Sequence, residues 1–178
     1  METKKFEILT AKSNIDWTGR KVTGAHNGTI DIKAGSLILT DGQLDGGSFV
    51  IDTTSIKILD ITDPDTNAQF AGHLFSEDFF ATESHPEAVF TIISADEISN
   101  GKYLIAGNLT IKGITHPVSF AADVVTGDNT ITATGKITID RTRYDMKFCS
   151  GNFFTNLGDT LIYNEFDLDV NITASASN

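Results

Sequence analysis

The stretch GNLTIKGITHPVSF, from Gly107 to Phe120, alternates apolar and polar residues with a period of two. Leu109 and Ile111 fall on one side of it, and polar residues separate them. We predict a turn from Gly113 to Pro117, after which the alternation resumes. A period of two indicates a β-strand with one buried face and one solvated face. The buried face must pack against the rest of the chain, either as a solid core or as the wall of a container.

The same alternation recurs along most of the chain, and Gly-, Asn- and Asp-rich turns such as TDGQLDGG, SNGK and TGDN separate the runs. The predicted strands are Trp17–Val22, His26–Ile32, Ser36–Thr40, Gly46–Ile58, Ala88–Ile98, Tyr103–Ile111, Val118–Val125, Thr130–Asp140 and Asn164–Ile172. Short strands at this spacing are typical of an antiparallel sandwich or barrel. About eight strands allow a sheet to close around side chains or one small ligand.

One long segment, from Asp65 to Phe90, breaks this period. Its apolar residues recur at helical spacing, at Phe70, Leu74, Phe75 and Phe79. We therefore predict a short helical insertion between about Asn67 and Ser84 that caps one end of the sheet, with a second helical turn starting at Ser76. Its phenylalanines either belong to the core or face a ligand, and the sequence leaves both readings open.

Composition points to one domain spanning residues 1–178, because no linker or change of composition divides the chain. The net charge of −11 disfavours nucleic acid and anionic membrane surfaces as partners. No apolar run is long enough to cross a bilayer, so stable membrane insertion is not expected. As it stands the sequence predicts a cytoplasmic location, whereas a removed signal peptide would make the protein periplasmic. Whether it forms a homodimer is left open.

Motifs for catalysis or metal binding are not found. The histidines His26, His73, His85 and His116 lack zinc-ligand spacing, and no nucleophile or phosphate-loop motif is present. The oxygen-rich run TDPDTN, from Thr62 to Asn67, lacks the calcium-loop pattern and is interpreted as a polar loop. We therefore predict no catalytic residue, no metal site and no cofactor, although an isoprenoid or fatty-acid-like ligand would be compatible.

Three further polar features have competing interpretations. His26 shares the buried side of its strand with Ile30, so it either orients a ligand head group or is a hydrogen-bonded core histidine, which is the better supported reading. Arg141 directly follows a strand and is expected to close the barrel end by donating to carbonyls rather than to meet an anionic head group. Asp167 and its acidic neighbours on the last strand are interpreted as solubilising charge on the wet face.

Six pieces of sequence, in order, resemble the YceI family, the lipocalin-like polyisoprenoid-binding proteins of bacteria. They are WTGRKVTGAHNGTI, GSFVIDTTSI, GHLFSEDFFATESHPEAVF, GNLTIKGITHPVSF, TGKITIDRTRYDMKF and LGDTLIYNEFDLDV, and the resemblance runs from about Phe6 to Ile172. It implies an all-β, eight-stranded antiparallel lipocalin-like barrel with a helical segment over one end. It also implies an elongated apolar tunnel that accepts an isoprenoid or fatty acyl chain with a small polar head, and no catalytic set of residues.

Parity along the strands, together with this resemblance, predicts which side chains contact a long-chain lipid ligand. They are Trp17, His26, Phe49, Ile51, Leu74, Phe75, Phe79, Phe90, Leu109, Ile111, Val118, Phe120 and Ile137. The leading hypothesis is non-enzymatic binding or carriage of such a lipid. One alternative is an isoprenoid-quinone-linked redox or enzymatic module that uses Cys149, His26 and Tyr144. Another is a filled barrel that serves as a scaffold or in a stress response.

Overall fold

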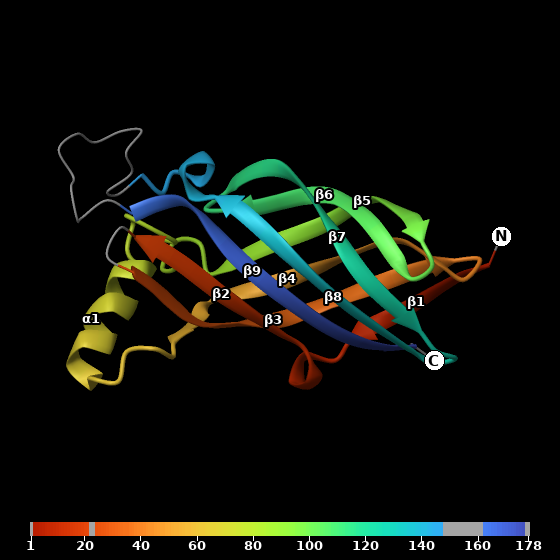
Figure 1. Cartoon of the computed structure of the whole chain (residues 1–178), viewed down its shortest axis with the longest axis horizontal. Coiled ribbons are helices and arrows are strands. Elements are labelled where there is room, and N and C mark those ends of the chain that lie inside the picture. Colours follow the sequence, from red (N-terminus) through yellow and green to blue (C-terminus); the bar gives the residue numbers. More distant parts are fainter. Residues whose placement is uncertain (1, 22–23, 148–161, 177–178) are drawn as a thin grey trace.

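The computed structural model describes residues 2–21, 24–147 and 162–176. In this part of the chain nine strands form one antiparallel sheet that closes on itself. Figure 1 shows an elongated barrel with helix α1 over one end and both chain termini at the other. The strands are β1 (Thr3–Ile8), β2 (Asn14–Lys21), β3 (Gly24–Thr40), β4 (Gln43–Ile58), β5 (Glu87–Ser99), β6 (Lys102–Ile111), β7 (Ile114–Thr126), β8 (Thr130–Asp140) and β9 (Ile162–Ala176).

The barrel has eight strand positions because β1 and β2 share one of them. β2 pairs with the start of β3 and with most of β9, whereas β1 pairs with Ser36–Thr40 of β3 and with the last residues of β9. The short 3₁₀ helix η1 (Thr10–Lys12) connects the two segments. The predicted eight-stranded antiparallel barrel is thus confirmed. The prediction missed β1, whose lysines and glutamate mask the buried side chains of Phe6 and Ile8.

Two strand boundaries differ from the prediction. The predicted pair His26–Ile32 and Ser36–Thr40 is one continuous strand, β3, in which a register shift near Lys33 interrupts the alternation. The turn after Ile111 contains only Lys112 and Gly113, which both have positive φ, the requirement of a two-residue type I′ hairpin. Pro117 therefore lies inside β7, in a part whose described registers pair only with β6.

Helix α1 (Pro64–Phe75) begins before the predicted helical segment and ends earlier. The side chain of Asp63 caps it by accepting a hydrogen bond of 3.0 Å from the backbone N–H of Thr66, and Pro64 occupies the first turn, where its missing N–H costs nothing. The interpretation of Thr62–Asn67 as a loop was therefore wrong from Pro64 onward. The predicted second helical turn at Ser76 is also wrong, because non-helical turns follow α1.

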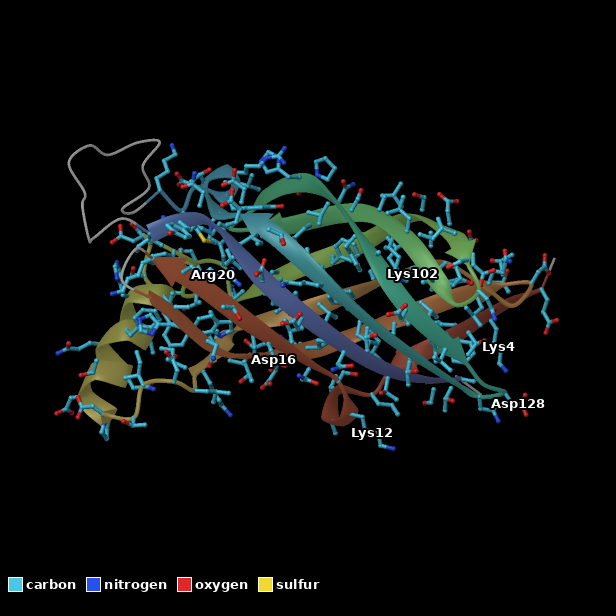
Figure 2. The ribbon with its side chains drawn as sticks, in the orientation of Figure 1. Lys4, Lys12, Asp16, Arg20, Lys102 and Asp128 are labelled. Carbon is cyan, nitrogen blue, oxygen red and sulfur yellow. The ribbon has the colours of Figure 1, made fainter. Side chains whose placement is uncertain are left out.

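The interior is apolar, as the alternation predicted, and charged groups gather outside. In Figure 2, Arg20 lies toward the α1 end of the barrel, and Lys4, Lys102 and Asp128 lie toward the opposite end. Asp167 is a correction to the prediction of purely solubilising charge, since it is buried on the outer wall. Its carboxylate meets Arg20 at 2.8 Å and accepts a hydrogen bond of 2.9 Å from Thr138. Although burial alone would raise the pKa of Asp167, these contacts outweigh burial and hold it below its ordinary value.

Candidate functional site

A cavity of about 500 Å³ occupies the α1 end of the barrel. Its walls consist mainly of inward-facing side chains of the strands. Helix α1 and the turn that follows it cover the end of the cavity, and we call these two segments the lid. The apolar lining includes Ile30, Ile51, Ile56, Leu109, Ile111, Leu168, Phe70, Leu74, Phe79 and Phe80. Cavities of this size and character are typical of small-molecule sites. The site therefore has room for an apolar ligand.

Polar side chains also line this cavity: Arg20, Lys21, His26, His73, Arg141, Tyr163 and Glu165. Nδ1 of His26 donates to Oδ2 of Asp60 over 2.8 Å, and the imidazole ring packs against the ring of Phe70 at 4.9 Å. Burial alone would raise the pKa of Asp60, but the hydrogen bonds from His26 and from the backbone N–H of Asn27 hold it below its ordinary value. His26 is thus both hydrogen-bonded, as predicted, and part of the cavity lining.

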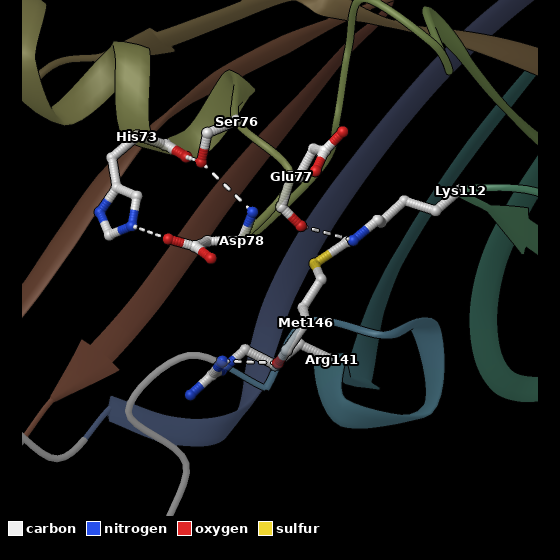
Figure 3. Close-up of polar contacts among 7 residues, drawn as sticks. All are labelled: His73, Ser76, Glu77, Asp78, Lys112, Arg141 and Met146. Atoms are coloured by element: carbon white, nitrogen blue, oxygen red, sulfur yellow. Dashed lines mark hydrogen bonds and ion pairs between the residues drawn. The ribbon is translucent and has the colours of Figure 1, made fainter.

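The turn after α1 is held in place by several polar contacts (Figure 3). Nε2 of His73 lies 3.0 Å from Oδ2 of Asp78, and the His73 ring meets the edge of Phe79 at 4.9 Å. Nζ of Lys112 donates to the backbone carbonyl of Glu77 over 2.8 Å. It also donates to the backbone carbonyl of Asp145, which Figure 3 does not draw, over 2.9 Å. The hairpin between β6 and β7 therefore ties the turn after α1 to the segment after β8.

Arg141 closes the barrel end through backbone carbonyls, so that prediction is confirmed. It starts the 3₁₀ helix η2 (Arg141–Tyr144) after β8 and is 3% exposed. Its guanidinium donates to the carbonyls of Met146, Ile162 and Tyr163 over 2.6, 3.0 and 3.0 Å. The guanidinium also lies 5.7 Å from the centre of the Phe79 ring. One side chain thus connects the end of β8, the start of β9 and the lid.

Trp17 contributes a polar atom that has no partner within the described part of the chain. Its indole N–H is buried, yet no acceptor among those residues receives a hydrogen bond from it. Buried donors are normally satisfied, and an unsatisfied one costs about 1–3 kcal/mol. Trp17 lines the cavity, but its indole nitrogen is covered by neighbouring atoms, so the donor lies close to the cavity and is not exposed to it.

The structure places the predicted ligand-contacting residues in three groups. Seven line the cavity: Trp17, His26, Ile51, Leu74, Phe79, Leu109 and Ile111. Three line a second cavity of about 30 Å³ deeper in the barrel: Phe49, Phe90 and Phe120. The remaining three, Phe75, Val118 and Ile137, are packed with the core and line neither cavity. Contact with a ligand remains a prediction for all of them.

Sequence reasoning missed several lining residues. Ile30, Phe166 and Leu168 were on the buried side by parity and could have been included. Met146, which is 1% exposed, follows η2 in a segment without periodicity, so no pattern signalled it. Arg20, Lys21 and Tyr163 lie at strand ends, where only the closed barrel brings them to the cavity.

The residues of the redox alternative are not gathered by the described structure. Tyr144 is 2% exposed, packs against the ring of His116 at 5.2 Å and does not line the cavity that His26 lines. Burial raises its pKa. Cys149 lies outside the described residues. Within those residues, no group of three or more His, Cys, Asp or Glu side chains is arranged to hold a metal ion. No helix there is both long and apolar enough to cross a bilayer.

Solved structures of similar shape come from bacteria. The BcnA protein of Burkholderia cenocepacia superposes with a TM-score of 0.71 at 19% identity, covering 94% of this chain and 99% of that one. A polyisoprenoid binding domain from Saccharophagus degradans, implicated in plant cell wall breakdown, superposes with a TM-score of 0.70 at 16% identity, covering 99% of this chain and 100% of that one. At these identities the likeness shows the shared fold.

Sequence comparison identifies the family. A UPF0312 protein of Photorhabdus laumondii is 37% identical over 89 residues, which are 44% of this chain and 44% of that protein. A UPF0312 protein of Shewanella baltica is 31% identical over 71 residues, 40% of this chain and 37% of that protein. The matched region thus spans less than half the length of these relatives. The model of the YceI-like domain matches residues 6–174, nearly the whole chain. The chain belongs to the YceI-like domain family.

Proposed function

We propose that this protein binds and carries a long-chain amphiphile of isoprenoid or fatty acyl type and does not catalyse a reaction on it. The observation that carries the proposal is the apolar cavity of about 500 Å³ beneath α1. Each methylene group transferred from water into such a cavity contributes roughly 0.8 kcal/mol, so a chain of about a dozen carbons binds tightly without a charged anchor. A polyisoprenoid-binding neighbour of the same fold adds support.

The polar side chains of the lining suit the ligand's head group. Arg20, Lys21 and His26 belong to β2 and to the start of β3, beside α1, where the cavity ends. We expect the indole N–H of Trp17, which has no acceptor among the described residues, to donate to a hydroxyl, carbonyl or carboxylate oxygen of a ligand that displaces the atoms now covering it. The apolar chain would then lie deeper in the barrel, against Ile51 and Leu109.

The lining supports binding rather than catalysis. Both cavity histidines pair with carboxylates, Asp60 for His26 and Asp78 for His73, and such a pair orients an imidazole without supplying a nucleophile. Among the described lining residues, Thr53 carries an aliphatic hydroxyl, and this hydroxyl donates a hydrogen bond to the backbone carbonyl of His85 over 2.8 Å. The hydroxyl proton therefore points to a structural acceptor, whereas a catalytic nucleophile must contact a base.

The proposal is tested by native mass spectrometry of protein purified from cells and by displacement of a fluorescent fatty acid. A co-purified amphiphile and competition by palmitate are expected. Leu109→Trp would place a large ring in the cavity and weaken both, whereas Leu104→Trp, on the outer face of the same strand, would leave both unchanged. A ligand-free spectrum combined with no binding of the probe would refute the proposed function.

A further inference from the structure

The barrel interior is divided across its middle. Neighbouring inward positions on one strand line different cavities: Ile51 and Phe49 on β4, Ala88 and Phe90 on β5. On β9 the same change occurs between Leu168 and Val170. The resemblance implied an elongated tunnel, but the described residues enclose a large cavity at the α1 end and, beyond the division, a void of about 30 Å³.

Three phenylalanine rings lie just beyond this division, where they line the smaller void, and we call Phe49, Phe90 and Phe120 the aromatic plug. The ring centres of Phe49 and Phe90 are 5.4 Å apart, and those of Phe90 and Phe120 are 5.7 Å apart. Both contacts are tilted, within the range that aromatic pairs favour. Phe49 and Phe90 are 4% and 1% exposed. The three rings come from β4, β5 and β7, and Leu37 of β3, Ile105 of β6 and Val170 of β9 line the same small void, so side chains from all around the barrel nearly fill the interior at this level.

Glycines on adjacent strands make room for the plug. A Cβ atom at Gly107 on β6 would lie 2.7 Å from Cζ of Phe90, and one at Gly135 on β8 would lie 3.2 Å from Cδ2 of Phe120. Any larger residue at Gly107 would displace the Phe90 ring, since real Cβ atoms do not approach so closely. Inward-facing glycines beneath aromatic rings are a known way of shaping sheet interiors. The plug is therefore built into the strands that surround it.

We infer that Phe90, at the centre of the aromatic plug, sets the longest chain that the cavity accepts. This inference rests on the proposed lipid-binding function. A methylene takes up about as much liquid volume as a water molecule, roughly 30 Å³, so the cavity of about 500 Å³ holds on the order of sixteen carbons. The ligand class is thus a single-chain amphiphile of fatty acid or isoprenoid type, and a chain that reaches Phe90 goes no deeper without displacing the plug.

The test is a series of saturated fatty acids, octanoate, laurate, palmitate and arachidate, titrated by displacement of a fluorescent fatty acid. Affinity of the wild-type protein is expected to rise about fourfold per methylene up to about palmitate and then to level off. In Phe90→Ala and Phe90→Leu the rise continues past palmitate, by about fourfold for each further methylene that the shortened side chain admits, so that in Phe90→Ala arachidate binds at least about tenfold more tightly than palmitate. In Ala88→Leu, which narrows the cavity just above Phe90, the plateau moves back toward laurate.

Phe6 is the matched control, because it is equally buried, at 1% exposed, and lines neither cavity. Phe6→Ala and Phe6→Leu should lose stability as the Phe90 variants do but keep the wild-type plateau. Should Phe90→Ala fail to fold, Phe90→Leu and Ala88→Leu still decide the question. The inference that Phe90 limits the chain length is refuted if the plateau stays in place in these two variants. It is also refuted if the affinity of the wild type keeps rising with chain length. Either result leaves the proposed function intact. Failure of every chain to bind refutes the proposed function itself.

Discussion

The two halves of the barrel share strands and composition but differ in how their interiors are filled. Toward the chain termini, Phe6, Phe49 and Phe90 pack into a nearly continuous core. Toward α1, inward positions on the same strands carry smaller or aliphatic side chains, as Ala88 does on β5, and leave a cavity of about 500 Å³. Tight packing supplies stability and empty volume supplies binding capacity, because a void forfeits the contacts that a side chain would make. This protein assigns the two tasks to opposite ends of one sheet.

The largest expected effect is on the stability of the filled half. Phe49→Ala should lower the free energy of unfolding by about 3–5 kcal/mol, since close packing surrounds the ring. Phe70→Ala, the counterpart on α1, removes a half-buried ring that faces the cavity and should cost about 1 kcal/mol. Urea unfolding of both variants measures the difference. Equal losses of unfolding free energy in the two variants would contradict the view that one half is packed for stability and the other is open for binding.

A second effect is expected on ligand exchange. Phe79 is buried, lines the cavity and contacts both His73 and Arg141, whereas Phe75 is half-buried and lines neither cavity. Phe79→Ala should raise the dissociation rate of a bound fatty acid about tenfold, since most affinity changes within one site appear in dissociation. Phe75→Ala is the control and should leave that rate unchanged. Stopped-flow displacement measures both rates. If Phe79→Ala loses much stability without releasing the ligand faster, the turn after α1 has a structural role and does not gate the cavity.

A smaller effect is expected at Trp17. Trp17→Phe removes the unsatisfied N–H and keeps an aromatic ring, so the free energy of unfolding should stay within about 1 kcal/mol of wild type. The affinity for fatty acids should fall about fivefold, the value of roughly one hydrogen bond. The gain in affinity per methylene should not change, because the chain lies elsewhere. An unaltered affinity would show that no ligand oxygen reaches this donor.

The smallest expected effect concerns acid stability of the outer wall. Because the folded pKa of Asp167 lies below its ordinary value near 3.9, the unfolded chain binds more protons at about pH 4 than the folded chain does. The stabilisation is complete above the ordinary pKa and is lost as the pH falls through the folded pKa. Asp167→Asn should therefore flatten the decline of stability below about pH 5. Asp169→Asn, on the exposed part of the same strand, is the control and should leave the decline unchanged.

Local patterns predicted the fold well where each strand has one buried face. The alternation around Leu109 placed β6 correctly, many such strands with short turns indicated a sandwich or a barrel, and the family resemblance implied the barrel that the structure shows. Errors arose where a local signal was masked or misread. Charged residues hid β1, and the capping residues Asp63 and Pro64 of α1 were interpreted as a polar loop. In both places the sequence contains the local signal, the alternation of Phe6 and Ile8 for β1 and the Asp63–Pro64 cap for α1, but the polar residues around it were given more weight.

The candidate site was less predictable, because parity says that a side chain points inward but not what it meets there. Phe90 and Leu109 have the same parity signal, and only the assembled barrel places Leu109 on the cavity wall and Phe90 in the plug. Arg141 could be assigned to carbonyl contacts because a buried guanidinium after a strand requires acceptors. Its partners, on the start of β9 and after η2, could not be named from the sequence.

The sequence by itself determined the all-β class of the fold and the apolar nature of its interior, since a period of two is a local property of the chain. It also determined family membership through residues 6–174. The tertiary structure decided where the interior is empty, which rings divide it and which polar groups, such as the indole N–H of Trp17, remain near the cavity. These features depend on how strands distant in sequence align around the barrel, because a void or a plug is a relation among side chains and not a property of any one of them.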